Sequence, residues 1–379
     1  MKVQGQPPLH LTYGLNVHPT ETWPELQAAV FERAAAVKAR VAPDRPFGLG
    51  LRIGRAVAGS LNDLELRTAF RRRIEAAGMY VFTINGFPYG RFHGARVKEQ
   101  VYTPDWRTPE RLAYTLYLAG LLADLLPEGV SGSISTLPVS YRSGISDPSD
   151  LDPAVRHLAQ VATHLDRLGQ QRGRDIHLGL EPEPGCVLEK SDEFFAFLRD
   201  RLWPRLPESA RSRLGLCLDV CHALVAYENP ADILRRCHKE GVRVSKIQIS
   251  AALEATPEGL AALKEFDEPV YLHQTSARGR DGHVESWRDL PDALTAWRDR
   301  PDFKSARVHF HVPMHFEGRP GLRSTAFLLD RDFFAAVRNG ATEHLEIETY
   351  SLPVMPGASH RDPSDSIAAE YEWVLDRLV

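Results

Sequence analysis

The chain has 379 residues, 43% of them hydrophobic, and its 46 basic and 50 acidic residues leave a net charge of −4. This balance argues against a protein that binds nucleic acid or an anionic membrane surface. The N-terminus lacks the unbroken apolar core of a signal peptide, and the most apolar stretch, residues 112–123, is too short to span a bilayer. The four cysteines form no CxxC pair, which favours free thiols in a reducing compartment. We therefore expect a cytoplasmic protein without membrane insertion.

Short apolar or β-branched runs recur along the chain, and each is long enough for one strand. They cover residues 9–18, 47–53, 80–87, 132–138, 176–184, 213–222, 243–250, 307–313 and 344–350. Between them we expect helices from Ser60 to before Gly78, from Thr108 toward Gly129, from Asp152 onward, from Asn229 to Gly241, and from Ser364 through the tail. This alternation predicts an α/β fold with a parallel sheet, closed into a (β/α)8 TIM barrel.

Nine predicted strands are one more than such a barrel needs. Either residues 47–53 or residues 307–313 are therefore an extra piece. The segment at about residues 251–306 interrupts the alternation and predicts an insertion on the C-terminal, catalytic face of the barrel. No Pro/Gly/Ser-rich linker divides the chain, so we expect residues 1–379 to form a single domain.

Acidic and imidazole side chains follow the predicted strands at the face where TIM barrels carry their active sites. They alternate with apolar residues, so they point inward together: Glu181, Glu183, Asp219, His222, Gln248, His309, His311, Glu346 and Glu348. Three carboxylates in one pocket of low dielectric repel one another unless a cation or protons neutralise them. A divalent ion is the simpler solution, and oxygen-rich ligation favours manganese, magnesium or cobalt over zinc.

These motifs resemble those of the xylose isomerase-like superfamily of TIM barrels, which includes the endonuclease IV type of repair enzyme. The resemblance lies in LEPEP, LDVCH, KIQIS and IETY. Over nearly the whole chain, INGFPYGRFHGARVKEQVYTPDW, GSISTLP, YLHQT, HFHVP and LEIETYSLPV also resemble the metabolite-traffic proteins of the EboE group.

The resemblance implies metal ligation by Glu181, Asp219 and Glu348, and it places the histidine of the D-x-x-H motif at His222. The fourth ligand, usually histidine, falls near Gln248. A neutral amide oxygen is a poorer donor than imidazole for transition metals, so His311, His309 or His273 is an alternative ligand.

We hypothesise the following roles for these residues. Metal ligands are Glu181, Asp219, Gln248, Glu348 and His311, and the ion is manganese, cobalt, magnesium or zinc. The catalytic residues are Glu181, Glu348 and His222. Substrate is expected to contact Asn85, His93, Glu183, His309 and His18. We expect the cysteines to be small, inert core residues.

Three functions remain open at this point. The first is a metal-dependent isomerase or epimerase of the sugar-phosphate-isomerase kind, acting on a small polyhydroxylated or keto metabolite. The second is a metal-assisted hydrolase of the endonuclease IV type, which would require more histidines in the site and a basic groove. The third is a non-catalytic carrier that binds a metabolite for biosynthesis or export, with pathway proteins as partners. A carrier needs the pocket but neither the ion nor an acid–base pair.

Overall fold

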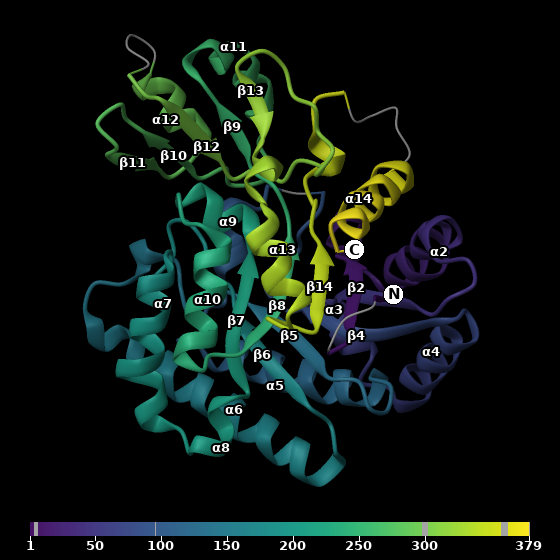
Figure 1. The fold of residues 1–379 in the computed structure, drawn as a ribbon. Helices are drawn as coiled ribbons and strands as arrows, with labels where there is room; N and C mark the ends of the chain where they lie inside the picture. The colour runs from purple at the N-terminus through teal and green to yellow at the C-terminus, as the bar shows by residue number, and fades with distance from the viewer. Residues whose placement is uncertain (4–6, 95, 298–301, 358–362, 379) are drawn as a thin grey trace.

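The computed structural model describes residues 1–3, 7–94, 96–297, 302–357 and 363–378. Its larger sheet has nine strands in the order β1-β2-β14-β8-β7-β6-β5-β4-β3, and β1 (Lys2–Val3) pairs with β2 in antiparallel orientation. The other eight strands run parallel and form a barrel (Figure 1): β2 (Leu9–Tyr13), β3 (Phe47–Arg52), β4 (Met79–Asn85), β5 (Gly132–Thr136), β6 (Ile176–Leu180), β7 (Leu214–Asp219), β8 (Val244–Ile249) and β14 (His344–Ile347).

The barrel closes between its two edge strands, β2 and β3. A parallel bridge joins Gly14 to Gly50, which brings the edges together and leaves the sheet nearly closed. Gly50 is required there because a Cβ atom would lie 2.3 Å from Oε2 of Glu346. The α/β fold and the TIM barrel predicted from the sequence are confirmed.

Helices surround the barrel on its outer side (Figure 1). They are α1 (Trp23–Ala28), α2 (Ala35–Val41), α3 (Arg55–Ser60), α4 (Leu64–Ala76), α5 (Pro109–Leu125), α6 (Asp152–Arg172), α7 (Ser191–Phe197), α8 (Glu208–Arg211), α9 (Val220–Val225), α10 (Pro230–Glu240), α13 (Arg331–Arg338) and α14 (Pro363–Leu378). Local signals set several ends: the side chain of Asn229 caps α10, and Gly173 and Gly241 end α6 and α10 with φ of 62° and 66°.

One predicted helix start was wrong. The sequence placed it at Ser60, but Ser60 ends α3 and the longer helix α4 begins at Leu64. Asp63 sets this start because its side chain accepts hydrogen bonds from the backbone amides of Glu65 and Leu66 at 2.8 and 3.0 Å. Leu64, the first residue of α4, is 65% exposed.

A second, smaller sheet contains five antiparallel strands in the order β11-β10-β12-β9-β13. We call it the small sheet: β9 (Leu253–Ala255), β10 (Thr275–Arg278), β11 (Val284–Trp287), β12 (Ser305–Val308) and β13 (Leu322–Ser324), with the short helices α11 (Leu260–Leu263) and α12 (Leu290–Ala296). Figure 1 shows it beyond the C-terminal ends of the barrel strands. The choice left open by the sequence is thereby decided: residues 47–52 belong to the barrel, whereas the 307–313 run begins in the small sheet.

The predicted insertion at about residues 251–306 falls within the small sheet, which continues to Ser324; residues 298–301 lie outside the described part of the chain. One continuous cluster of buried apolar side chains includes residues of both sheets, such as Leu216 in β7 and Val308 in β12. The assignment of residues 1–379 to a single domain stays a prediction.

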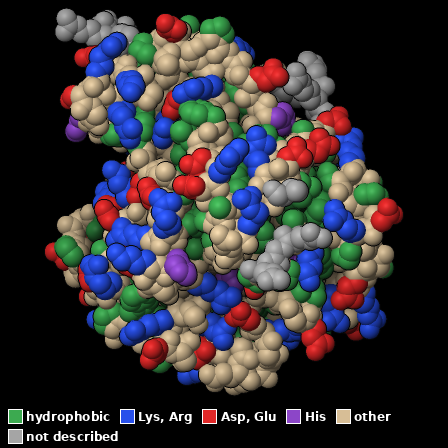
Figure 2. All heavy atoms as spheres, in the orientation of Figure 1, with side chains coloured by type: hydrophobic (Ala, Val, Ile, Leu, Met, Phe, Trp, Pro, Cys, Tyr) green, Lys and Arg blue, Asp and Glu red, His purple; other side chains and the backbone are tan. Residues whose placement is uncertain are grey.

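Charges are mixed on the surface of the molecule. Lys and Arg side chains are interspersed with Asp and Glu over the face in Figure 2. We also find, within the described residues, no helix with both the length and the apolar character needed to cross a bilayer.

Candidate metal centre

A cavity of about 60 Å³ lies at the C-terminal ends of the barrel strands. Glu181, Glu183, His222 and Glu348 line it from the barrel side, and His309 lines it from the segment after β12. Three aromatic residues that pack on one another also line the cavity, and we call them the aromatic cover: Phe92, Tyr271 and Tyr350. Since one water needs about 10–15 Å³ of such space, the cavity has room for on the order of five water molecules.

Three acidic residues meet beneath this cavity, and we call them the carboxylate triad: Glu181, Asp219 and Glu348. Glu181 follows β6, Asp219 ends β7 and Glu348 follows β14. One carboxylate oxygen from each lies within 4.8 Å of those of the other two, and all three side chains are buried. Burial first, and then the neighbouring carboxylates, raise the pKa of Glu181 and of Glu348 well above the usual value.

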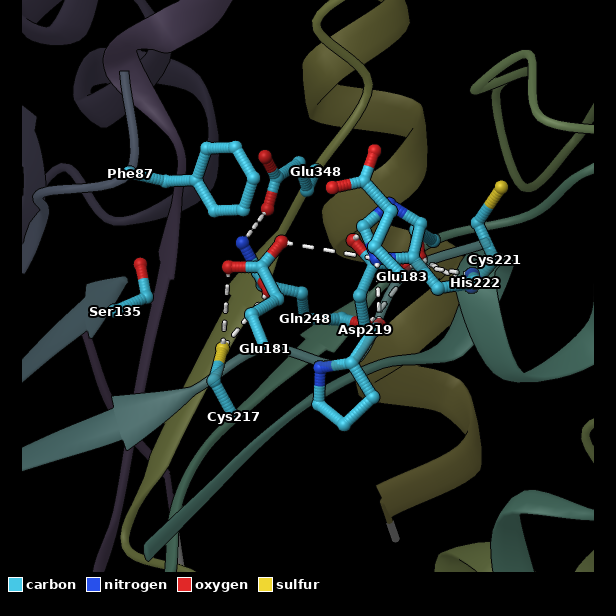
Figure 3. A network of polar contacts seen from close by, with 12 residues as sticks. Phe87, Ser135, Glu181, Glu183, Cys217, Asp219, Cys221, His222, Gln248 and Glu348 are labelled. Carbon is cyan, nitrogen blue, oxygen red and sulfur yellow. Dashed lines mark hydrogen bonds and ion pairs between the residues drawn. The ribbon is translucent and has the colours of Figure 1, made fainter. Parts of the chain in front are cut away.

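Polar neighbours hold the triad in place (Figure 3). Oδ1 of Asp219 accepts a hydrogen bond from Ser250 at 2.7 Å and from the backbone amide of His222 at 3.2 Å, which caps α9. Oδ2 of Asp219 is buried and has no hydrogen-bond partner. Glu348 accepts from Asn16 at 2.7 Å and from the side-chain amide of Gln248.

Gln248 was predicted as a metal ligand, and the structure gives it a different set of contacts. Its amide nitrogen donates to Glu348, and its amide oxygen accepts from the thiol of Cys217 at 2.9 Å. Both ends of the amide are therefore occupied by hydrogen bonds, so Gln248 positions Glu348 in this arrangement. Cys217 also lies 3.7 Å from Glu181, so this thiol forms part of the floor of the site.

Three histidines lie beside the triad, and we call them the histidine trio: His222, His309 and His311. Nε2 of His309 lies 3.0 Å from Nε2 of His222 and 3.2 Å from Nε2 of His311. Oδ2 of Asp219 lies 3.9 Å from Nε2 of both His222 and His311. All three rings are buried, and burial lowers the pKa of each, to about 4 for His222.

His309 and His311 reach the site by a route that the sequence did not predict. The strand parity of residues 307–313 predicted that they point into the pocket, whether or not this run belongs to the barrel. In the structure β12 ends at Val308, and both residues lie in the irregular segment that follows it. The small sheet thus delivers both imidazoles to the barrel.

Glu183 lies on the other side of His222 and His309. Its Oε1 accepts from the Tyr102 hydroxyl at 2.7 Å and from Gln274 at 3.3 Å, while its Oε2 is buried without a partner. Burial outweighs the two hydrogen bonds and raises the pKa of Glu183 to about 8.

The other predicted substrate contacts divide into two groups. Asn85 lines the cavity, and its Oδ1 accepts a hydrogen bond from the backbone amide of Phe87 at 3.1 Å. His18 and His93 do not line it: Nε2 of His18 lies 3.0 Å from the Tyr13 hydroxyl, and Nδ1 of His93 lies 3.6 Å from Glu21. Both are turned to neighbours in the N-terminal segment, where the sequence could not reveal their partners.

Several residues of the site were not identified from the sequence. Cys217 shares the strand parity of Asp219 two residues later, and that signal could have found it. Tyr102 and Gln274 come from the segments that cover the barrel, where no periodicity in the sequence predicts which way a side chain points. Lys246 lies one layer below the triad, where it pairs with Glu346 at 2.9 Å and contacts Ser135 at 3.1 Å.

The donor set fits a divalent cation. Three mutually repelling carboxylates meet here: Glu181 and Glu348 have raised pKa, and Oδ2 of Asp219 has no hydrogen-bond partner although it is buried. A buried anionic oxygen without a partner is costly unless a positive charge faces it. Carboxylate oxygens of this kind suit magnesium, manganese or cobalt.

Three solved structures share the fold at low sequence identity. A xylose isomerase-like TIM barrel protein from Mycobacterium smegmatis in complex with magnesium matches with a TM-score of 0.54 and 13% identity, covering 98% of this chain and 96% of that chain. The IOLI protein with a bound zinc atom matches with a TM-score of 0.52 and 11% identity over 98% of both chains. A D-tagatose 3-epimerase-like protein matches with a TM-score of 0.50 and 12% identity over 97% of this chain and 98% of that one.

These matches show that the chain has the fold of the xylose isomerase-like TIM barrels. No protein-family model and no curated protein sequence matches it.

Proposed function

We propose that this protein is a divalent-metal-dependent isomerase or epimerase, of the sugar-phosphate-isomerase kind, that acts on a small polyhydroxylated or keto metabolite. The observation that carries the proposal is the carboxylate triad, in which two buried glutamates with raised pKa lie close to Asp219, whose Oδ2 is buried without a hydrogen-bond partner. The bound magnesium, the bound zinc and the epimerase-like name among the structural neighbours belong to those proteins and support the proposal by analogy.

Glu181, Asp219 and Glu348 would hold the ion. A divalent cation there would polarise a carbonyl and its neighbouring hydroxyl, which makes the C–H between them more acidic. Glu181 and Glu348 come from strands on different sides of the barrel, β6 and β14. A glutamate carboxyl group can both accept and return a proton, so one of the two would remove the proton and the other would deliver it.

Other residues of the cavity would orient the substrate and keep water away. His222 and Asn85 can hydrogen-bond substrate hydroxyls, and the Tyr102–Glu183 pair presents a further polar contact. The aromatic cover of Phe92, Tyr271 and Tyr350 encloses the cavity from the other side. This small, covered space favours a metabolite over a polymer such as DNA.

A metal-assisted hydrolase is the second candidate. The observation that favours it is the histidine trio next to the triad, because a hydrolase of the endonuclease IV type is expected to need a histidine-rich site. The mixed surface charge in Figure 2 and the net charge of −4 do not offer the basic groove that a nucleic acid needs. A hydrolase that acts on a small ester or phosphate would agree with both the histidine-rich site and the mixed surface charge.

Within the superfamily we also propose membership of the EboE group of metabolite-traffic proteins, with cytoplasmic location and pathway proteins as partners. A non-catalytic carrier of that group would keep the cavity but would need no acid–base pair. A test for catalysed conversion of a metabolite therefore distinguishes the carrier from the enzyme.

Proton exchange with solvent tests the proposed function. The full chain loaded with Mn²⁺ is incubated in D₂O with a panel of ketoses, aldoses, their phosphates and keto acids, and NMR follows the C–H groups next to the carbonyl. We expect deuterium to enter one compound, and we expect Glu181→Gln and Glu348→Gln each to slow the exchange by roughly 100-fold or more.

Glu265→Gln is the control variant, because Glu265 is exposed, pairs with the exposed Arg319 and does not line the cavity. It should exchange at the wild-type rate. If both active-site variants exchange as fast as wild type, the isomerase proposal fails. Incorporation of ¹⁸O from water into a cleaved product, without deuterium at carbon, would identify the hydrolase instead.

A further inference from the structure

Phe92 is the member of the aromatic cover that comes from the irregular segment between β4 and α5. Its ring is 6% exposed and packs on Tyr271 and Tyr350, with ring centroids 5.1 and 5.3 Å apart. It lies outside the helices and strands, so their ladders of hydrogen bonds do not fix its backbone. Other polar groups must therefore satisfy the backbone amides at this point and hold the ring over the cavity.

The carboxylate of Glu21 takes the place of a backbone partner. Its Oε1 accepts hydrogen bonds from the backbone amides of Phe92 at 2.9 Å and of His93 at 3.1 Å. Glu21 lies 71 residues before Phe92, just before α1, and its own backbone amide donates to Glu25 of that helix at 2.9 Å. Hydrogen bonds to an ionised carboxylate are among the stronger ones in proteins. One oxygen thus holds two consecutive residues of the segment.

Arg52, the last residue of β3, ties this carboxylate to the barrel. Its side chain is fully buried, and its Nη1 lies 3.0 Å from Oε1 of Glu21, whose side chain is 10% exposed. Its Nη2 donates to the carbonyl of Gly90, two residues before Phe92. We call Glu21 and Arg52 the anchor pair, because the guanidinium joins a barrel strand to residues 90–93 both directly and through the carboxylate.

The charges of the anchor pair depend on each other. A guanidinium removed from water is costly unless a negative group faces it. Burial acts to raise the pKa of Glu21, but the contacts with His93, Arg52 and Phe92 outweigh it and lower the pKa to about 2. The carboxylate is therefore ionised at neutral pH and neutralises Arg52.

A different cation holds the two ends of the same segment. Arg111 in α5 is buried and donates from Nη1 to the carbonyls of Gly86 at 2.8 Å and Phe87 at 3.0 Å. Its Nε donates to the carbonyl of Pro104 at 2.8 Å. These contacts fix where the segment leaves β4 and where it approaches α5. The anchor pair acts on the middle of the segment, where Phe92 lies.

We propose that Glu21 and Arg52 are positioning residues of the site, which hold Phe92 in the aromatic cover through the backbone of residues 90–93. The cavity that Phe92 lines is also lined by two members of the carboxylate triad, so an ion or metabolite reaches them past the cover. A firmly held cover slows this passage and excludes water during a reaction, while the metal ligands stay as they are. The inference deepens the proposed function and rests on it only for the reaction that the cover encloses.

Two variants of the full chain remove the anchor pair in different ways. Glu21→Gln keeps an oxygen that can accept from the two amides but removes the charge, which leaves Arg52 buried without its partner and can weaken the fold. Glu21→Gln combined with Arg52→Met removes both charges together, so neither is left unpaired. Asp175→Asn is the matched control, because Asp175 also pairs with arginines, Arg213 and Arg243, but at the N-terminal end of β6, away from the cavity.

Hydrogen exchange tests the anchor without any metal. The amides of Phe92 and His93 should exchange at least about 10-fold faster in both variants than in wild type, relative to the amides of the barrel strands. Asp175→Asn should leave both amides at their wild-type rates. Wild-type protection of Phe92 and His93 in both variants would overturn the proposal, whether or not the protein is an isomerase.

Release of Mn²⁺ to excess chelator tests the effect on the site. We expect release at least about 10-fold faster in both variants, with an equilibrium Kd within about threefold of wild type, because a looser cover speeds entry and exit alike. Phe92→Ala should have the same effect, and adding Glu21→Gln to it should speed release no further, since the two changes act through one group.

Two results would overturn the positioning role. One is a Kd that weakens in step with the release rate, which would mean that the anchor pair acts on the metal ligands. The other is acceleration by Glu21→Gln that adds fully to that of Phe92→Ala, which would mean that Glu21 does not act through Phe92. A wild type that binds no Mn²⁺ would contradict the metal-dependent function alone, and hydrogen exchange would then decide on the anchor pair.

Discussion

At the scale of single residues, the two oxygens of Glu183 have unequal surroundings. Oε1 is hydrogen-bonded by Tyr102 and Gln274, and Oε2 is buried without a partner. The hydrogen bonds favour the ionised form, but burial dominates and the pKa rises to about 8. In metal-free protein at neutral pH this residue is therefore mostly protonated, so folding is linked to proton binding.

This linkage predicts how stability depends on pH. A carboxyl whose pKa is raised in the folded state stabilises it fully below the unfolded pKa of about 4.3, and this contribution is lost as the pH rises toward 8. With chelator present, the contribution of Glu183 to the unfolding free energy should fall from pH 5 to pH 8, whereas the buried histidines with lowered pKa contribute in the opposite direction at the acidic end. Glu183→Gln removes only the Glu183 contribution, so the difference in unfolding free energy between wild type and this variant should change by up to about 1.4 kcal/mol per pH unit.

Urea denaturation at pH 5, 6, 7 and 8 measures the two slopes. Glu265→Gln, at an exposed position, should run parallel to wild type. A Glu183→Gln slope equal to that of wild type would mean that Glu183 is ionised in the folded protein.

Individual residues also show which features of the site can be predicted from sequence patterns. Positions after strands placed Glu181, Asp219, His222 and Glu348 at one end of the barrel, because parity and strand ends are one-dimensional signals. The contacts of Gln248 could not be predicted from the sequence, because strand parity shows only that its amide faces inward. An inward-facing amide can either ligate a metal ion or donate a hydrogen bond. Only the positions of Cys217 and Glu348 in space decide between these roles.

At the scale of elements, Arg307 anchors β12 by an ion pair within the small sheet and by a hydrogen bond to α9. Arg307 in β12 pairs with Glu254 in β9 at 2.9 Å and donates to the carbonyl of Leu224 on α9 at 2.8 Å. Arg323 in β13 also pairs with Glu254, at 2.6 Å. Since His309 follows Arg307 by two residues, this ion pair fixes the strand that presents the histidines.

Loss of the Glu254 charge should loosen the small sheet. Glu254→Gln leaves Arg307, whose side chain is 11% exposed, without its ion-pair partner, and breaking a buried pair in this way costs about 3 kcal/mol. Chemical denaturation measures this loss, and hydrogen exchange should show faster exchange in β9, β12 and β13 than in the barrel strands. Glu265→Gln removes an exposed pair and should cost less than about 1 kcal/mol. Unchanged protection of β12 in Glu254→Gln would contradict this role.

The element scale explains why the sequence left one strand ambiguous. Residues 47–53 and 307–313 are both short, apolar and alternating, so local pattern alone cannot assign either to the barrel. Pairing decides the matter: β3 lies beside β4 in parallel register, whereas β12 lies antiparallel between β9 and β10. Such pairing joins residues far apart in the chain and leaves no local trace.

At the scale of the whole molecule, the repeat of strand and helix was sufficient to predict the barrel, because a parallel sheet needs a helical crossover between neighbouring strands. The small sheet breaks this repeat, and its strands are short and antiparallel. It lies beyond the C-terminal ends of the barrel strands (Figure 1), and the segment that follows its strand β12 brings His309 and His311 to the site, beside His222 of α9. The metal chemistry of the molecule is therefore expected to depend on both sheets.

Metal binding should consequently stabilise the whole fold. An ion that binds only the folded state at a concentration 100 times its Kd adds about 2.7 kcal/mol, which for a chain of this size raises Tm by on the order of 5 °C. Wild type with Mn²⁺ or Zn²⁺ should therefore melt several degrees higher than wild type with chelator. Asp219→Asn keeps the shape but removes one charge of the carboxylate triad, so its Tm should barely respond to metal.

Two comparisons make this experiment decisive. The Tm of Asp219→Asn in chelator measures the effect of weakening the helix cap separately from the effect of losing the metal. The cap is weakened because Asp219 also accepts a hydrogen bond from the backbone amide of His222. Gln248→Ala removes the hydrogen bonds to Glu348 and Cys217 but no charge, so it should retain part of the metal response. If wild type melts identically with and without chelator and takes up no divalent ion at millimolar concentration, the buried carboxylates must be held by protons alone. Glu181 and Glu348 would then stay protonated at neutral pH, and a carrier that binds its metabolite without acid–base chemistry would be the better explanation of the cavity.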